Sequence, residues 1–172
     1  MRINKYISRA GVCSRRDADT LVEQGRVTIN GEVVSEHGTR VRKGQTVRVD
    51  GQVISPQRFE YILLHKPKDT ISTTDDPRDR DTVLEAVGVR GDNPKGIFPV
   101  GRLDRNTTGV LLLTNDGDLA HKLMHPRYEI EKIYHVRTQT RVKPHEIDHL
   151  KRGVELDDGL AQADNVAYLD PN

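Results

Sequence analysis

The chain of 172 residues contains one cysteine, Cys13, and no apolar run long enough to cross a membrane. A single cysteine excludes an internal disulfide and a zinc site built from cysteines. The first residues carry no apolar signal stretch, so we expect a cytoplasmic protein without a membrane partner. Cys13 itself is predicted to be a small buried residue in a turn between helices.

The sequence also lacks the signatures of several large enzyme classes. It has no Walker-type phosphate loop, no Gly-x-Gly-x-x-Gly segment opening a helix and no Gly-x-Ser-x-Gly elbow. These absences argue against NTPases, dehydrogenases and hydrolases. His121 and His125 have the spacing of two metal ligands on a helix, but no carboxylate lies at the zincin position between them. We therefore expect no metal.

Charge is unevenly distributed along the chain, although the net charge is only +1. Residues 1–59 contain 11 Lys and Arg against 6 Asp and Glu, a net charge of +5, whereas residues 60–172 contain 16 against 20, a net charge of −4. We call the basic residues 1–59 the head and the mildly acidic residues 60–172 the body. This distribution of charge indicates that the head binds a polyanion and that the body has a different function.

The head is predicted to contain two helices and a small antiparallel sheet. Apolar residues at near-helical spacing predict a helix from Ile3 to Ala10. The segment 14–17, Ser-Arg-Arg-Asp, is typical of a capping box that opens a second helix, which Gly25 ends. The turn pairs Asn30-Gly31 and Asp50-Gly51 stand between strand-like segments and predict two tight hairpins.

Cations on the two helices can form one basic face. Such a face would contact phosphates along a nucleic acid, with salt-sensitive affinity and little sequence selectivity. An ordinary solvated charged surface is the alternative that these residues alone leave open. The candidate RNA-binding residues of the head are Lys5, Arg9, Ser14, Arg15, Arg16 and Arg26.

The order of elements in residues 1–57 resembles the S4 RNA-binding domain. The resemblance rests on Arg2-Ile3-Asn4-Lys5-Tyr6-Ile7, Ser14-Arg15-Arg16, Gly25-Arg26-Val27 and Ile29-Asn30-Gly31. It implies an RNA-gripping head. Because Pro56 interrupts any continuing strand, we place the linker near residues 55–59 and a second domain at 60–172.

The second domain is predicted to be a mixed α+β domain. Its hydrophobic pattern alternates between strand-like and helix-like segments, separated by polar loops. The predicted elements are strands at 61–64, 97–100, 109–114, 129–138 and from 154, helices around 83–87, after 115–118 and from Pro144, and an exposed loop at 73–81.

The most informative segment is Gly101–Gly109, a polar stretch between two apolar strands. It holds Asp104 beside a buried strand and between Arg102 and Arg105, whose charges favour the ionised carboxylate. We expect this carboxylate to be partly desolvated and able to act as a nucleophile or base. The residues alone leave open that Asp104 merely caps a turn through its arginine neighbours.

The second domain resembles the pseudouridine synthases of the small-ribosomal-subunit type and their large-subunit relatives. The matching motifs are Gly101-Arg102-Leu103-Asp104, residues 108–119, His65-Lys66-Pro67 and Lys132-Ile133-Tyr134-His135-Val136. The resemblance implies a mainly antiparallel catalytic domain that isomerises a specific uridine of ribosomal RNA to pseudouridine. The family's domain continues beyond the point where this chain stops, so we expect residues 60–172 to be incomplete.

The resemblance places the family's essential aspartate on Asp104 and its active-site tyrosine on Tyr134. Asp104 would open the reaction by covalent addition or by taking a sugar proton. Tyr134 would stack on the base and help to remove the C5 proton, the alternative being a half-buried strand aromatic. Residues expected to assist by charge or by binding phosphate are Lys66, Arg102, Arg105 and Lys132, with pairing to Asp104 as the alternative for Arg102.

We expect a monomer that acts on ribosomal RNA or a ribosomal subunit precursor. Isomerisation involves no net redox change and no group donor, so no cofactor or metal is expected. A noncatalytic RNA-binding or ribosome-assembly protein is the rival interpretation. The presence of both Asp104 and Tyr134 argues against the noncatalytic version. The sequence names neither the target uridine nor the ribosomal RNA that carries it.

Overall fold

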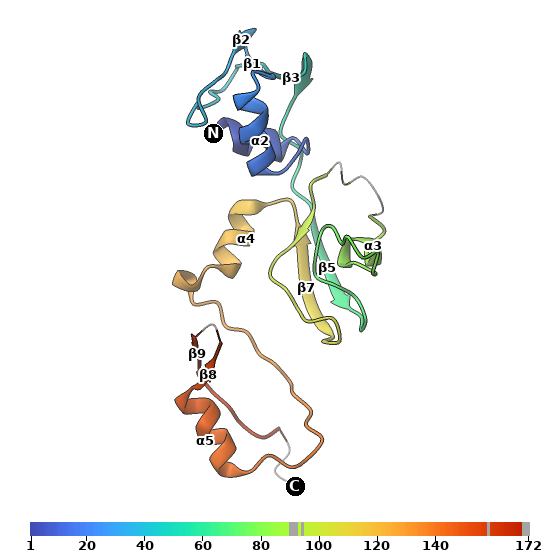
Figure 1. The fold of residues 1–172 in the computed structure, drawn as a ribbon, viewed down its shortest axis with the longest axis vertical. Coiled ribbons are helices and arrows are strands. Elements are labelled where there is room, and N and C mark those ends of the chain that lie inside the picture. The colour runs from blue at the N-terminus through green and yellow to red at the C-terminus, as the bar shows by residue number, and fades with distance from the viewer. Residues whose placement is uncertain (90–92, 94, 158, 170–172) are drawn as a thin grey trace. The chain divides into compact units, whose positions relative to one another are not determined.

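A computed structural model describes residues 1–89, 93, 95–157 and 159–169 (Figure 1). The chain folds as two compact units, residues 1–130 and 131–172. The first unit contains two separate hydrophobic cores, one formed by residues 3–49 and one by residues 83–113. The fold is mixed α+β with antiparallel strand pairing in each sheet, which confirms the predicted class.

Residues 1–54 form two helices and one antiparallel sheet, as predicted. The strand order is β2-β1-β3-β4, with the two hairpins at the predicted turn pairs. Asn30 and Gly31 adopt φ of 52° and 91°, the left-handed conformation that a tight two-residue hairpin turn requires. The elements are α1 (Ile3–Arg9), α2 (Arg15–Glu23), β1 (Val27–Ile29), β2 (Glu32–Val33), β3 (Val47–Val49) and β4 (Gln52–Ile54).

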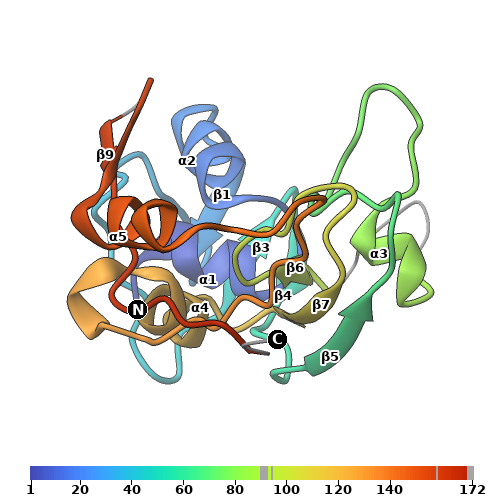
Figure 2. The ribbon, with the colours of Figure 1, turned by 90° about the horizontal axis from the view of Figure 1, so that it is seen from below.

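The second helix begins where its cap predicted. The Ser14 hydroxyl accepts a hydrogen bond from the backbone N–H of Asp17 at 3.2 Å and donates one to the Asp17 carboxylate at 2.7 Å. The first bond satisfies one of the free donors at the start of α2. Helices α1 and α2 contact each other, and their course can be followed in Figures 1 and 2. Their buried apolar residues belong to the same core as those of the sheet.

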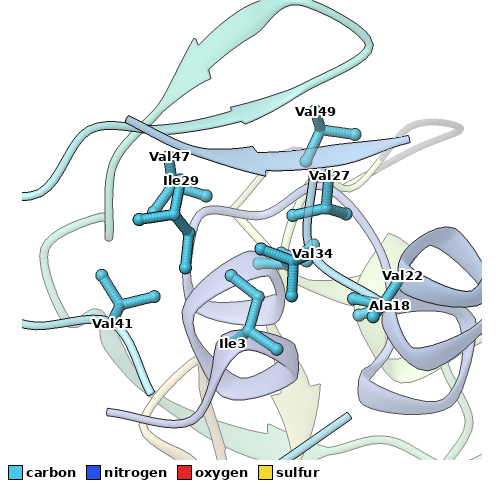
Figure 3. Close-up of a cluster of buried hydrophobic side chains, with 10 residues drawn as sticks. Ile3, Ala18, Val22, Val27, Ile29, Val34, Val41, Val47 and Val49 are labelled. Atoms are coloured by element: carbon cyan, nitrogen blue, oxygen red, sulfur yellow. The ribbon is translucent and has the colours of Figure 1, made fainter. Parts of the chain in front are cut away.

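The head core is built from aliphatic side chains of both helices, the sheet and the connecting loops (Figure 3). Ile3, Ile7 and Val22 are fully buried from the helix side, and Val47 is fully buried from the sheet. Cys13 is half-buried against this core, and burial raises the pKa of its thiol. Its environment fits the predicted structural role more than a reactive one.

A second antiparallel sheet follows, with the order β5-β7-β6. Strands β5 (Tyr61–Lys66) and β7 (Gly109–Thr114) pair along their whole length, and β6 (Phe98–Pro99) pairs with the end of β7. Helix α3 (Val83–Ala86) packs its apolar residues into the core beneath this sheet. Prediction and structure agree on these strands, although β6 is shorter than the apolar segment 97–100.

The chain leaves β7 through a polar turn and enters helix α4 (Gly117–Met124), followed by the short 3-10 helix η1 (Pro126–Tyr128). Asp116 caps α4 by accepting hydrogen bonds from the backbone N–H groups of Asp118 and Leu119, both at 3.1 Å. The helix predicted after residues 115–118 is therefore present.

The second unit contains helix α5 (Pro144–Arg152) and the hairpin of β8 (Val154–Leu156) and β9 (Gly159–Ala161). These elements start where Pro144 and Val154 predicted them. The strand predicted at 129–138 is wrong, because this segment pairs with no other part of the chain that the structure describes. Alternation alone does not make a strand, since the backbone groups need a hydrogen-bonded neighbour.

Among the residues that the structure describes, no helix is both long enough and apolar enough to cross a membrane.

Candidate functional site

The loop that carries Asp104 joins β6 to β7 and lies at the end of the β5–β7 pair. The side chains of Arg102, Asp104 and Arg105 are exposed, whereas Leu103 between them packs against the second core. The predicted partial desolvation of the Asp104 carboxylate is therefore wrong for this structure. Backbone carbonyls of the loop, and not the Asp104 carboxylate, point toward the interior.

Those carbonyls surround the ammonium of Lys66, the last residue of β5. The Lys66 side chain is fully buried, and its Nζ donates to the carbonyls of Pro67, Asp104, Arg105 and Thr107 at 3.1, 2.9, 3.0 and 2.9 Å. An ammonium has three protons, so the four acceptors share them. Burial lowers the pKa of Lys66, and the nearby Asp104 carboxylate partly opposes that shift.

Two further contacts hold the same loop. The Ser72 hydroxyl accepts a hydrogen bond from the N–H of Leu103 at 3.1 Å and donates one to its carbonyl at 2.8 Å. Arg105 forms an ion pair with Asp69 at 2.6 Å. The main chain on both sides of Asp104 is thus fixed while its carboxylate faces outward.

The two predicted phosphate contacts Lys66 and Arg105 have different surroundings. Lys66 was expected to assist as a phosphate contact, yet its burial leaves no ammonium surface for RNA. Arg105 is predicted to contact phosphate; its exposed guanidinium pairs with Asp69, and the phosphate contact stays a prediction. Ser72 was missed, because nothing near it in the sequence indicates contact with a loop 31 residues away.

The predicted basic residues of the head have varied surroundings. Arg15 and Arg16 are exposed at the start of α2. Arg26 is bound through two nitrogens to Asp50, whose pKa this hydrogen bonding lowers. Ser14 is engaged in the helix cap described above.

Two cations of α1 contact the region that follows the head. The Lys5 ammonium lies 2.6 Å from both carboxylate oxygens of Asp118 at the start of α4. The Arg9 guanidinium lies over the ring of Phe59, 4.3 Å from its centroid. Hydrogen bonding to Lys5 lowers the pKa of Asp118, and the charges of Arg15 and Arg9 act in the same direction.

A hollow of about 450 Å³ lies on the head and is lined by Met1, Arg2, Asn4, Lys5, Arg15 and Arg40. Arg2 and Arg40 were missed as candidates. Their backbones meet in an isolated antiparallel bridge, and no sequence pattern links two residues so far apart in the chain. With these additions, four cationic side chains surround one concave surface that suits a phosphate.

Tyr134 and Lys132 belong to the second unit, where both side chains are exposed. Asp104 belongs to the first unit, and each unit is defined by its own contacts. The roles expected for Tyr134 and Lys132 in the reaction therefore stay predictions.

His121 and His125 lie near each other, but the described residues include no group of three or more His, Cys, Asp or Glu side chains placed to hold a metal ion. A stable protein metal site usually needs at least three such ligands.

Comparison with known proteins gives two family matches. Residues 60–170 match the RNA pseudouridylate synthase family, and residues 1–47 match the S4 domain family. A solved structure described as a pseudouridylate synthase aligns with a TM-score of 0.50 and 23% identity, over 92% of this chain and 67% of that one. That structural likeness concerns the fold.

Curated relatives are similar along nearly the whole chain. An uncharacterised RNA pseudouridine synthase of Aquifex aeolicus is 45% identical over 171 residues, which is 98% of this chain and 68% of that protein. The ribosomal large subunit pseudouridine synthase B of Bacillus subtilis is 40% identical over 158 residues, which is 92% of this chain and 64% of that protein. The chain thus spans about two thirds of the length of these relatives.

Proposed function

Because the chain belongs to the RNA pseudouridylate synthase family and begins with an S4 domain, we propose that it isomerises a specific uridine of ribosomal RNA to pseudouridine. Asp104 initiates the reaction and Tyr134 assists removal of the C5 proton. Residues 1–57 grip the RNA and residues 60–172 belong to the catalytic domain. The protein acts as a cytoplasmic monomer without cofactor.

One observation carries this proposal: the buried Lys66 ammonium binds the carbonyls of the Asp104 loop from behind, so that the carboxylate faces outward on a fixed main chain. A nucleophile or base is most effective when its position is set before the substrate arrives. An aspartate that only capped a turn would accept backbone N–H bonds, whereas the Ser72 and Lys66 contacts fix the loop without using the carboxylate.

The chemistry needs few groups. The target base must first leave its stack, which costs a few kcal/mol and is easiest in loops and bulges. Asp104 then adds to the nucleoside or takes a sugar proton, and the bond between the ribose and the uracil nitrogen breaks. The uracil turns, bonds to the ribose through C5, and loses the C5 proton with the help of Tyr134, while Lys132 assists by charge.

We assign RNA binding to the head and to exposed cations near the Asp104 loop. The basic hollow and the exposed Arg15 and Arg16 supply phosphate contacts, and Arg102 stands beside Asp104 to hold a phosphate or fill the space that the base vacates. Ribosomal RNA is favoured as the substrate because curated relatives include ribosomal large subunit pseudouridine synthases.

The test is a pseudouridine assay on unmodified ribosomal RNA transcripts, read by chemical adduct formation and reverse-transcriptase stops. Asp104→Asn is compared with Asp75→Asn, which changes an exposed aspartate outside the site. We expect one stop that Asp75→Asn retains and Asp104→Asn abolishes. If the 172-residue chain forms no pseudouridine, the same variants are assayed in a chain extended to the length of the Aquifex relative.

The rival function is noncatalytic RNA binding. It predicts no stop with either length of chain, together with tight RNA binding that Asp104→Asn leaves unchanged. That pair of results would replace the enzyme proposal with an RNA-binding or ribosome-assembly role.

A further inference from the structure

Three aromatic side chains that the proposed mechanism does not use cluster at the end of α4 and in η1. Helix α4 is labelled in Figure 1. We infer that this cluster stacks on an unpaired base of the RNA substrate, next to the target uridine. The inference rests on the proposed RNA substrate and adds a second place where the body holds it. The cluster consists of His121, His125 and Tyr128, flanked by Lys122 and Arg127, and is called the α4–η1 patch.

The rings lie close enough to form one continuous surface. The centroids of His121, on α4, and His125, the residue that directly follows α4, are 4.8 Å apart. Tyr128 stands edge-on to both, at 5.9 Å from His121 and 6.4 Å from His125. Both histidines are exposed and Tyr128 is half-buried, so the rings do not fill the core. Exposed aromatic faces are what single-stranded RNA bases stack on.

The second histidine also determines the local backbone. His125 Nδ1 accepts a hydrogen bond from the N–H of Arg127 at 3.2 Å, which caps the turn that carries Tyr128. The turn that this bond caps carries Tyr128, whose ring stands edge-on to both histidines.

The charges around the rings suit a polyanion. The Arg127 guanidinium lies over the Tyr128 ring, 4.5 Å from its centroid, and Lys122 is exposed on the last turn of α4. Within residues 121–129 the two cations face one carboxylate, the exposed Glu129 that ends η1, and Asp118 on the first turn of α4 is bound to Lys5. Stacking rings with adjacent cations are the combination that binds a single strand through both base and phosphate.

The patch is connected to the Asp104 loop. The sulfur of Met124, on the same last turn of α4, accepts a hydrogen bond from the N–H of Gly101 at 2.9 Å. Gly101 opens the segment that leads to Asp104, so the helix end lies against the start of the catalytic loop. An RNA strand that presents its uridine to Asp104 can place a neighbouring base on the rings.

The experiment measures binding of the full chain to two probes, a short oligouridylate and an abasic chain of the same length. Tyr128→Leu and His121→Leu remove one ring each, and Tyr128→Phe keeps the ring as a matched control. We expect the two leucine variants to bind oligouridylate roughly 5- to 100-fold more weakly, the effect of losing one stacking contact. Binding to the abasic chain should stay unchanged, and Tyr128→Phe should match the unmodified protein on both probes.

Thermal unfolding of each variant separates lost contact from lost fold. If Tyr128→Leu unfolds early, the exposed His121→Leu decides the question. Wild-type affinity for oligouridylate in the folded leucine variants overturns the inference, and so does an equal loss on both probes. The assay needs no catalysis, so failure of the proposed isomerase activity would leave this result standing.

Discussion

The ammonium of Lys66 donates a hydrogen bond to the backbone carbonyl of Asp104 at 2.9 Å, and the same nitrogen holds the carbonyls of Arg105 and Thr107. A charged group buried at the end of β5 thereby orders a loop 38 residues further along the chain. The Lys66 ammonium binds backbone carbonyls as a cation at the end of a helix does. Here the bound carbonyls belong to the loop that carries the proposed catalytic carboxylate.

Removing the Lys66 ammonium should disturb the Asp104 loop and have little effect on RNA binding. We expect Lys66→Met to lower the free energy of unfolding by about 1–3 kcal/mol, because buried carbonyls lose their donor. Pseudouridine formation should fall while the affinity for RNA changes little, since the head is untouched. Lys68→Met, which removes an exposed lysine two residues away, is the control.

Unfolding by denaturant and single-turnover rates measure the two effects. A Lys66→Met protein with unchanged rate and reduced RNA affinity would show that Lys66 contacts the RNA after all.

The Lys5–Asp118 ion pair should compete with RNA for the Lys5 ammonium. Asp118 is also close enough to Arg9 and Arg15 to feel their charges. Its carboxylate therefore neutralises positive charge that an RNA phosphate would otherwise contact. We expect Asp118→Asn to tighten RNA binding by up to about fivefold at low salt, the scale of one exposed ion pair.

Binding is titrated against salt, with Glu36→Gln on the head as the control for the loss of a negative charge. Weaker binding in Asp118→Asn than in Glu36→Gln would mean that the pair helps to orient the head instead.

The Asp76–Arg80 pair should make stability depend on acid. Arg80 binds both carboxylate oxygens, at 2.7 and 2.9 Å, and this hydrogen bonding holds the pKa of Asp76 well below its ordinary value. A depressed carboxyl pKa stabilises the fold above the unfolded pKa of roughly 4, and the contribution is lost as pH falls toward the folded pKa.

Unfolding midpoints measured from neutral pH down to about pH 2 should therefore fall less steeply for Asp76→Asn than for the unmodified protein. Asp75→Asn, which removes an exposed neighbouring carboxylate, is the control for the loss of one charge. Equal slopes for all three proteins would show that the pair also persists in the unfolded chain or adds nothing to the fold.

The two faces of the β5–β7 sheet should respond differently to the same truncation. Leu113 is fully buried in the second core, whereas Leu63 on the paired strand is 73% exposed. We expect Leu113→Ala to cost about 2–5 kcal/mol of unfolding free energy and Leu63→Ala to cost within about 0.5 kcal/mol. A large loss for Leu63→Ala in chemical denaturation would show that its face is covered.

Much of the head was predictable because its signals act over a few residues. The Ser14 cap, the Asn30-Gly31 turn and the Asp50-Gly51 turn each specify a local backbone conformation, and the structure has all three. Strand β7 was predictable for a similar reason, since a short continuous apolar run bounded by polar turns suits a strand in a core. The motif around Asp104 likewise identified the loop from its residues alone.

Only the tertiary structure decided what surrounds that loop. The burial of Lys66, the Ser72 contact with Leu103 and the Lys5–Asp118 pair each join segments far apart in the sequence. The segment 129–138 alternates as a strand does, yet it has no strand partner in the part of the chain that the structure describes. Local signals fix turns and helix ends through neighbouring dihedral angles and caps, whereas burial, ion pairing and strand pairing depend on which distant segments the fold brings into contact.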